Sequence, residues 1–183
     1  MTSRSAPAAR GDTPGPVNFR AYVGLGGNLG DAHETLEAAL AALQAVEGVQ
    51  VEAVSSAYGS RPVDADGPDY VNAVASVQSV LGPLELLHAL QAIEWQYGRE
   101  RPYRHAPRTL DLDLLLYDSA RRHSAELTLP HPRWAERAFV LEPLAELVQV
   151  LGDVVTAMPD RAERARLAAL QGIEKSPRAL HFK

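Results

Sequence analysis

The chain has 183 residues, 46% of them hydrophobic and 22% charged, which fits one globular domain. Its net charge of −5 disfavours generic nucleic-acid binding, and the absence of cysteine excludes disulfides, thiolate catalysis and cysteine metal sites. No apolar run approaches the roughly 18 residues that span a bilayer, and the N-terminus lacks the apolar core of a signal peptide, so we expect a cytoplasmic protein.

Residues 1–17 are rich in Pro, Ala, Gly and Ser and show no apolar period. We predict that they form a disordered N-terminal extension in front of a single domain over residues 18–183. The alternative is an arm for targeting or for binding a partner.

The rest of the chain alternates between strand and helix patterns. A strand is expected over 19–25, followed by a helix over 31–46 in which leucines recur at helical spacing behind the predicted N-cap Asp31. The elements expected next are a strand over 49–58, a loop over 59–69, a strand over 70–80, a helix over 83–97, a basic loop over 98–108, a strand over 110–117, a short helix over 132–139 and a charged helix over 160–170. This β-α-β-β-α-β order predicts an α+β, ferredoxin-like fold with helices packed on one face of an antiparallel sheet, plus a C-terminal extension.

Two carboxylates stand two residues apart on the strand expected over 110–117. Because side chains alternate along a strand, Asp111 and Asp113 share one face, and Leu110 and Leu112 share the other. Two such carboxylates repel each other, and Mg²⁺, which binds one or two carboxylates together with substrate phosphates, would relieve the repulsion. The alternative is that both are hydrated on an exposed sheet face.

A basic segment just before this strand favours the metal interpretation. It contains Arg99, Arg101, Arg104 and Arg108 in an otherwise acidic protein, and arginine suits bidentate phosphate binding. An acidic pair beside an arginine-rich loop is what a polyphosphate requires. The alternative is a hydrated loop whose arginines pair with nearby acids such as Glu94.

Three further groups carry weaker signals. Pro130-His131-Pro132-Arg133, followed by Arg137, adds cationic groups, although a lone histidine in a turn is more often structural. Tyr70 and Asn72 share a strand face and could hold a flat heterocycle, or could be ordinary core residues. The glycines of residues 24–30 fail the GxGxxG register, and the chain has no GxxxxGK[ST] loop, so we interpret them as a tight strand-to-helix turn.

Together these segments resemble the 6-hydroxymethyl-7,8-dihydropterin pyrophosphokinase family over about residues 19–150. The central match is Ala106-Pro107-Arg108-Thr109-Leu110-Asp111-Leu112-Asp113-Leu114-Leu115-Leu116. The supporting matches, in family order, are Gly26-Gly27-Asn28-Leu29-Gly30, Ser55-Ser56-Ala57-Tyr58, Pro68-Asp69-Tyr70-Val71-Asn72, Leu129-Pro130-His131-Pro132-Arg133 and Arg137-Ala138-Phe139-Val140. The signature is specific in combination and weak in any single piece.

The resemblance implies a complete set of site residues. Asp111 and Asp113 would hold two Mg²⁺ ions, and with Arg99 and Arg108 they would form the catalytic group. The residues around the co-substrate ATP would be Gln91, Glu94, Arg99, Arg101, Arg108, Thr128, His131 and Arg137. The residues around the pterin would be Ser60, Pro62, Val63, Tyr70, Asn72 and Phe139, with the two aromatic rings on either side of it.

The implied reaction belongs to folate synthesis. The pterin hydroxyl attacks the β-phosphorus of ATP, and AMP leaves. The implied partners are these two small molecules, with no nucleic acid and no membrane. The implied oligomeric state is a monomer. Gly27, His105, Glu126 and Pro132 depart from residues common in the family, which bears on individual ATP contacts.

Two rival functions share part of the pattern. A nucleotide-sugar glycosyltransferase with an Asp-x-Asp motif would use Asp111 and Asp113, but it has no need of Tyr70, Asn72 and Phe139. A ferredoxin-like RNA-binding module would need surface aromatics in its central strands, which the sequence lacks.

Overall fold

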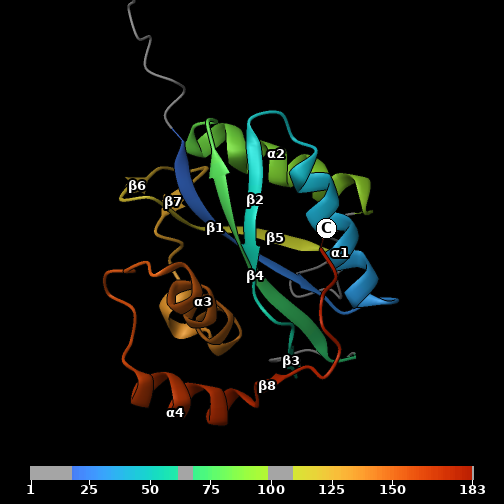
Figure 1. Cartoon of the computed structure of the whole chain (residues 1–183), viewed down its shortest axis with the longest axis vertical. Helices are drawn as coiled ribbons and strands as arrows, with labels where there is room; N and C mark the ends of the chain where they lie inside the picture. The colour runs from blue at the N-terminus through green and yellow to red at the C-terminus, as the bar shows by residue number, and fades with distance from the viewer. Residues whose placement is uncertain (1–17, 62–67, 99–108, 183) are drawn as a thin grey trace, which may run out of the picture.

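The computed structural model describes residues 18–61, 68–98 and 109–182, and its centre is an antiparallel sheet (Figure 1). The order β5-β1-β4-β3-β8 runs across this six-stranded sheet, with β2 also paired to β4. The strands are β1 (Phe19–Gly27), β2 (Val49–Val54), β3 (Tyr58–Ser60), β4 (Tyr70–Ser79), β5 (Asp111–Tyr117) and β8 (Glu174–Lys175). A separate pair is formed by β6 (Arg122–His123) and β7 (Thr128–Leu129).

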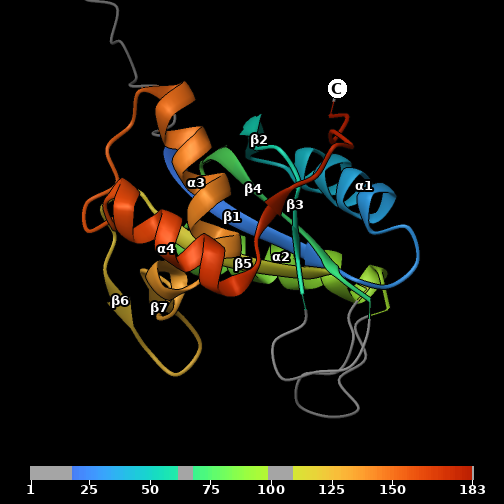
Figure 2. The same cartoon turned by 90° about the horizontal axis from the view of Figure 1, so that it is seen from below.

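Helices cover both faces of the sheet. On one face lie α1 (Ala32–Gln44) and α2 (Pro83–Gln96), and on the other lies α3 (Ala138–Leu151), preceded by the 3₁₀ turn η1 (Trp134–Glu136) (Figures 1 and 2). The helix α4 (Arg161–Gln171) packs against α3. The predicted α+β class and antiparallel sheet are confirmed. The expectation that helices lie on one face only is wrong, because α3 buries its own apolar side against the second face.

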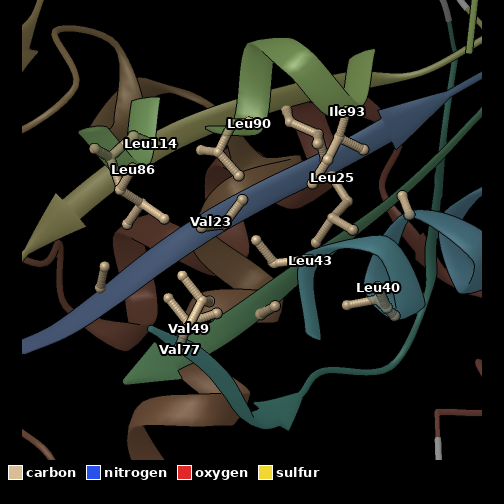
Figure 3. Packing of buried hydrophobic residues seen from close by; sticks show 14 of the residues in the cluster. Val23, Leu25, Leu40, Leu43, Val49, Val77, Leu86, Leu90, Ile93 and Leu114 are labelled. Atoms are coloured by element: carbon tan, nitrogen blue, oxygen red, sulfur yellow. The ribbon is translucent and has the colours of Figure 1, made fainter. Parts of the chain in front are cut away.

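The larger core lies between the sheet and the helices α1 and α2. Val23 and Leu25 of β1 point toward Leu43 of α1 and toward Leu90 and Ile93 of α2 (Figure 3). All five side chains are 3% exposed or less. Alternate positions of β1 therefore belong to this core, and the intervening positions face α3.

One predicted strand is divided in two. β2 pairs with the last part of β4 and β3 pairs with its first part, so both lie along the same edge of β4. Ser55, between them, replaces a ladder contact with its side chain: its Oγ accepts from the Val74 N–H at 3.0 Å. The single strand expected over 49–58 is therefore interrupted at the serine.

The C-terminal segment returns to α1 after α4. The Ser176 N–H donates to the Ala57 carbonyl at 2.8 Å, and Arg178 pairs with Asp31 at 2.8 Å. Asp31 is also the N-cap of α1, as predicted, and accepts from the Glu34 N–H at 3.1 Å. Among the helices that the structure describes, none is long and apolar enough to cross a membrane.

Candidate active site

A cleft of about 420 Å³ opens on the α3 face of the sheet. β1, β4 and β5 form its floor, and the segment from η1 into α3 forms a wall. The cleft brings together six of the residues predicted from the sequence or from the resemblance: Tyr70, Asn72, Asp111, Asp113, Arg137 and Phe139. Residues that are far apart in the chain therefore converge on one surface.

The acidic pair lies on the face that strand periodicity predicts. Asp111 and Asp113 are partly exposed toward the cleft, whereas Leu112 and Leu114 are buried in the core beneath α2. The carboxylates are thus held on adjacent same-face positions of one strand, where they can act together on a ligand.

Two glycines lie beside the acidic pair on the neighbouring strand. Gly24 pairs with Asp113 and Gly26 with Asp111 in the β1–β5 ladder, so β1 adds no side chain to this part of the floor. The turn predicted over residues 24–30 is wrong for Gly24, Gly26 and Gly27: β1 continues through Gly27, because pairing with β4 and β5 on its two sides outweighs the low strand preference of glycine. The turn comes later, at Gly30, whose φ is +63°.

Asn72 is held in place by the strand beside it. Its Nδ2 donates to the Ser60 Oγ at 2.9 Å and approaches the Tyr58 carbonyl at 3.4 Å. Asn72 is 6% exposed and Ser60 is 7% exposed. A buried amide with a bonded nitrogen has a fixed orientation, so Asn72 presents a defined edge to the cleft.

Arg137 links the acidic and aromatic parts of the cleft. Its Nη1 lies 3.5 Å from Oδ2 of Asp113, and its guanidinium carbon lies 5.5 Å from the centre of the Phe139 ring. The second distance is within the range of a cation–π contact. A single cationic side chain therefore contacts one residue predicted for metal binding, Asp113, and one predicted for the pterin, Phe139.

A smaller cavity of about 250 Å³ adjoins the cleft and shares Asp113 with it. Thr128 and His131, both predicted around ATP, line this cavity. Burial lowers the pKa of His131 below its ordinary value, against the opposing effect of the Asp113 charge. Its Nδ1 accepts from the Arg133 N–H at 3.2 Å, so the neutral ring carries its proton on Nε2.

The remaining predicted residues lie on α2 or outside the described residues. Gln91 and Glu94 lie on α2, and the Glu94 Oε1 accepts from the Leu112 N–H at 2.9 Å, which satisfies a backbone group of β5. Glu94 is 2% exposed. Five predicted site residues lie outside the described residues: Pro62, Val63, Arg99, Arg101 and Arg108.

Sequence reasoning missed several residues of the cleft. Gly24 and Gly26 had a usable signal, since they continue the alternation of β1 on the face of Tyr22. Arg133, which the sequence marks only as a cationic group before Arg137, lines the cleft as well, and the two arginines lie on either side of η1. Gln171 had no signal at all, because it comes from α4, far from every motif.

The model of the 7,8-dihydro-6-hydroxymethylpterin-pyrophosphokinase (HPPK) family matches residues 22–149. The chain belongs to this family. The match runs from β1 to the last turns of α3 and includes Asp111, Asp113 and Phe139. It ends before α4 and β8, so the C-terminal extension lies outside it.

Curated proteins agree with membership of the HPPK family. A Synechocystis protein named 2-amino-4-hydroxy-6-hydroxymethyldihydropteridine pyrophosphokinase is 45% identical over 142 residues, which cover 78% of this chain and 72% of that protein. The protein of the same name from Pseudomonas aeruginosa is 43% identical over 164 residues, covering 87% and 98%. The folic acid synthesis protein fol1 of Schizosaccharomyces pombe is 38% identical over 143 residues, covering 78% of this chain and 20% of that protein.

The family predicted from the motifs is therefore confirmed. With it, the assignment to ATP-dependent pyrophosphokinases of folate synthesis is confirmed. ATP is the co-substrate of HPPK enzymes. The roles of the individual site residues stay predictions.

Proposed function

We propose that this HPPK-family chain transfers pyrophosphate from ATP to the hydroxyl of 6-hydroxymethyl-7,8-dihydropterin and uses the cleft on the α3 face to do so. One observation carries the proposal: Asp111 and Asp113 face the same cleft as Tyr70, Asn72 and Phe139. The carboxylates suit a polyphosphate with its cation, and the aromatic and amide groups suit a flat heterocycle.

The pterin would bind at the end of the cleft formed by β4 and α3. Tyr70 and Phe139 supply aromatic faces, and stacking of this kind contributes about 0.5–1.5 kcal/mol beyond burial for an aromatic pair. The Asn72 Nδ2 is already bonded to Ser60, so its Oδ1 would accept from an N–H group on the pterin edge. Pro62 and Val63 complete the predicted pterin set.

ATP would lie across the acidic pair toward the smaller cavity. Thr128 and His131 line that cavity, and Arg137 contacts Asp113, which borders it, and Phe139 at the pterin end. The guanidinium of Arg137 would contact the transferring phosphoryl groups, where a charge-assisted bond is strongest. Gln91, Glu94, Arg99, Arg101 and Arg108 remain predicted ATP contacts.

The donor set fits magnesium. Asp111 and Asp113 offer carboxylate oxygens from adjacent same-face positions, and the phosphates of ATP would supply further oxygens. We propose that these two residues hold two Mg²⁺ ions. When bound, the ions would neutralise the charge that develops on the transferring group.

The reaction asks the chain mainly for alignment. The hydroxyl oxygen of the pterin forms a bond to the β-phosphorus, the bond from that phosphorus to the bridging oxygen of the α-phosphate breaks, and AMP leaves with that oxygen. The hydroxyl proton passes to solvent. Asn72 and the two aromatic rings would fix the hydroxymethyl group in line, which is the principal protein contribution to phosphoryl transfer.

A direct assay tests the proposal. The chain is incubated with ATP, Mg²⁺ and 6-hydroxymethyl-7,8-dihydropterin, and AMP is measured together with the pterin pyrophosphate. A matched reaction uses 6-methyl-7,8-dihydropterin, which lacks the attacking hydroxyl and should give no AMP. Release of ADP, or equal AMP release without the hydroxyl, contradicts the proposal.

Four broader predictions belong with this function. The partners are the two small-molecule substrates, with no nucleic acid and no membrane. The chain acts as a monomer, and it works in the cytoplasm. Residues 18–183 form one domain behind the extension of residues 1–17.

A further inference from the structure

The C-terminal helix α4 contributes a side chain to the cleft. Arg164, Leu167 and Gln171 are spaced three and four residues apart, which places them on one side of the helix. Arg164 lies 4.0 Å from Glu142 of α3, and Leu167 packs into the hydrophobic cluster around α3. This side of α4 therefore faces α3, and Gln171 extends it to the first residue of that helix.

The amide of Gln171 makes two hydrogen bonds to the backbone on either side of Arg137. Its Oε1 accepts from the Ala138 N–H at 2.9 Å, and its Nε2 donates to the Glu136 carbonyl at 2.8 Å. The first N–H groups of a helix have no partner within the helix. Arg137, the N-cap of α3, has no side-chain acceptor to offer, so Gln171 takes over that task.

These two bonds fix the peptide groups on both sides of Arg137. Arg137 contacts Asp113 at 3.5 Å, and it lies over the ring of Phe139, the next residue but one. The direction in which both side chains leave the backbone depends on the orientation of those peptide groups. Loss of the amide would free the start of α3 and let the two side chains turn away from the cleft.

We propose that Gln171 is a positioning residue for the pyrophosphokinase reaction, acting through Arg137 and Phe139. It comes from the extension beyond residues 22–149, the part matched by the HPPK family model. The inference rests on the proposed function, because it takes Arg137 as a phosphate contact and Phe139 as a pterin contact.

Two substitutions at the same position test this inference. Gln171→Met keeps the length of the side chain and removes both hydrogen bonds. Gln171→Glu keeps the acceptor for the Ala138 N–H and loses only the donor to Glu136. Leu170→Ala is the matched control on the same helix, because Leu170 is 73% exposed.

The measurements are pterin affinity by titration calorimetry, single-turnover release of AMP, and a thermal melt. We expect Gln171→Met to lose about fivefold or more in both pterin affinity and turnover rate, since a hydrogen bond of ordinary strength has this effect on an equilibrium. Gln171→Glu should lie between Gln171→Met and the parent, and Leu170→Ala should match the parent. If Gln171→Met does not fold, Gln171→Glu is compared with the parent by the same three measurements.

Two outcomes separate failure of this inference from failure of the proposed function. If the parent releases AMP and Gln171→Met equals it in affinity and rate while melting at a lower temperature, Gln171 is a structural cap and the inference is overturned. If the parent itself releases no AMP from ATP and the pterin, the proposed function is wrong.

Discussion

The α3 face of the sheet carries two cavities of similar size, and both are lined by charged side chains. The cleft at one end measures about 420 Å³, and the cavity at the other end measures about 460 Å³. The second is lined by Arg20, Tyr22 and Asp153, among others. Volume therefore does not distinguish them, and what differs is how the charged groups are arranged.

At the far end the charged groups are bonded to one another. The guanidinium of Arg20 donates to both oxygens of Glu52 at 2.9 and 2.8 Å, and the Tyr22 hydroxyl donates to Asp153 at 2.6 Å. Burial and the bond to Asp153 raise the pKa of Tyr22, so its hydroxyl stays protonated. This is a closed network that ties β1 to β2 and to the end of α3.

At the cleft end the same strand contributes almost no side-chain volume. Positions 20, 22, 24 and 26 of β1 share one face, and they read Arg, Tyr, Gly, Gly. Arg20 and Tyr22 take part in the far network, whereas Gly24 and Gly26 leave the floor beside the acidic pair open. One strand thus stabilises the fold at one end and makes room for a ligand at the other.

The largest expected effect is a loss of turnover when charge is removed from the acidic pair of the cleft. The same substitution in the far network serves as the comparison. Asp111→Asn and Asp113→Asn should each lower turnover by about a hundredfold or more, because lost stabilisation of the transferring group costs several kcal/mol. Asp153→Asn, the matched change in the far network, should lower the melting temperature and leave turnover near that of the parent. AMP release and a thermal melt on the three variants provide the check. Near-parent turnover in a folded Asp111→Asn variant at saturating Mg²⁺ would remove the metal proposal.

The second expected effect concerns the anchoring of α3, the helix whose start forms a wall of the cleft. Glu146 of α3 accepts from the Ser56 N–H at 3.1 Å, from its hydroxyl at 2.9 Å, and from the Tyr58 hydroxyl at 3.0 Å. Burial raises the pKa of Glu146, but these bonds outweigh burial and hold it below its ordinary value. Glu146→Gln should lower the free energy of unfolding by about 2 kcal/mol, as expected for hydrogen bonds to a charged group.

Urea denaturation at neutral pH measures this loss of stability. Glu142→Gln is the control on the same helix: Glu142 meets Arg164 only at 4.0 Å, so its replacement should cost less than about 0.5 kcal/mol. Equal losses in the two variants would show that Glu146 does not anchor α3 to β3.

Much of the fold follows from periodicity. The alternation over β4 and β5, the leucine spacing of α1 and the Asp31 cap are local features, and the structure contains all of them. The helix α3 was missed except at its start, because Pro143 interrupts an apolar run that only becomes helical against the sheet. β8 has two exposed residues and exists only through its pairing with β3.

The site could be predicted to the extent that it is local or typical of the family. Period two placed Asp111 and Asp113 on one face, and the resemblance brought Phe139 to the pterin set. The space beside Asp111 at Gly26 depends on the pairing of β1 with β4 and β5. The hydrogen bonds of Gln171 join segments that are 33 and 35 residues apart. No local pattern encodes contacts of this kind.

The third expected effect tests the open floor. A Cβ on Gly26 would lie 3.3 Å from the Asn72 Oδ1, a tight contact, so Gly26→Ala should push the amide away from its present position. We expect pterin affinity to fall by about tenfold, or about 1.4 kcal/mol. Titration with pterin and with ATP separately measures the effect, which should be larger for pterin.

Gly24→Ala is the control for this substitution. Its Cβ would meet methyl groups of Leu115 at 3.4 and 3.5 Å, close to ordinary van der Waals contact, and its three nearest neighbours are all atoms of Leu115. Its pterin affinity should fall less than that of Gly26→Ala. The reverse order would mean that the orientation of Asn72 does not determine pterin binding.

The smallest expected effect belongs to the far network. Tyr22→Phe removes the hydroxyl that donates to Asp153, which should lower the free energy of unfolding by about 1 kcal/mol and leave AMP release unchanged.

The Tyr22 hydroxyl is the main reason why the pKa of Asp153 lies below its ordinary value of 3.8. A carboxylate with a depressed pKa contributes stability above its unfolded pKa and loses it as the pH falls through the folded pKa. The difference in unfolding free energy between parent and variant should therefore be full at pH 6 and shrink as the pH falls below 3.8. Urea denaturation across this range measures it, and a difference that stays constant to the lowest pH at which both proteins fold would show that the bond to Asp153 does not stabilise the far end.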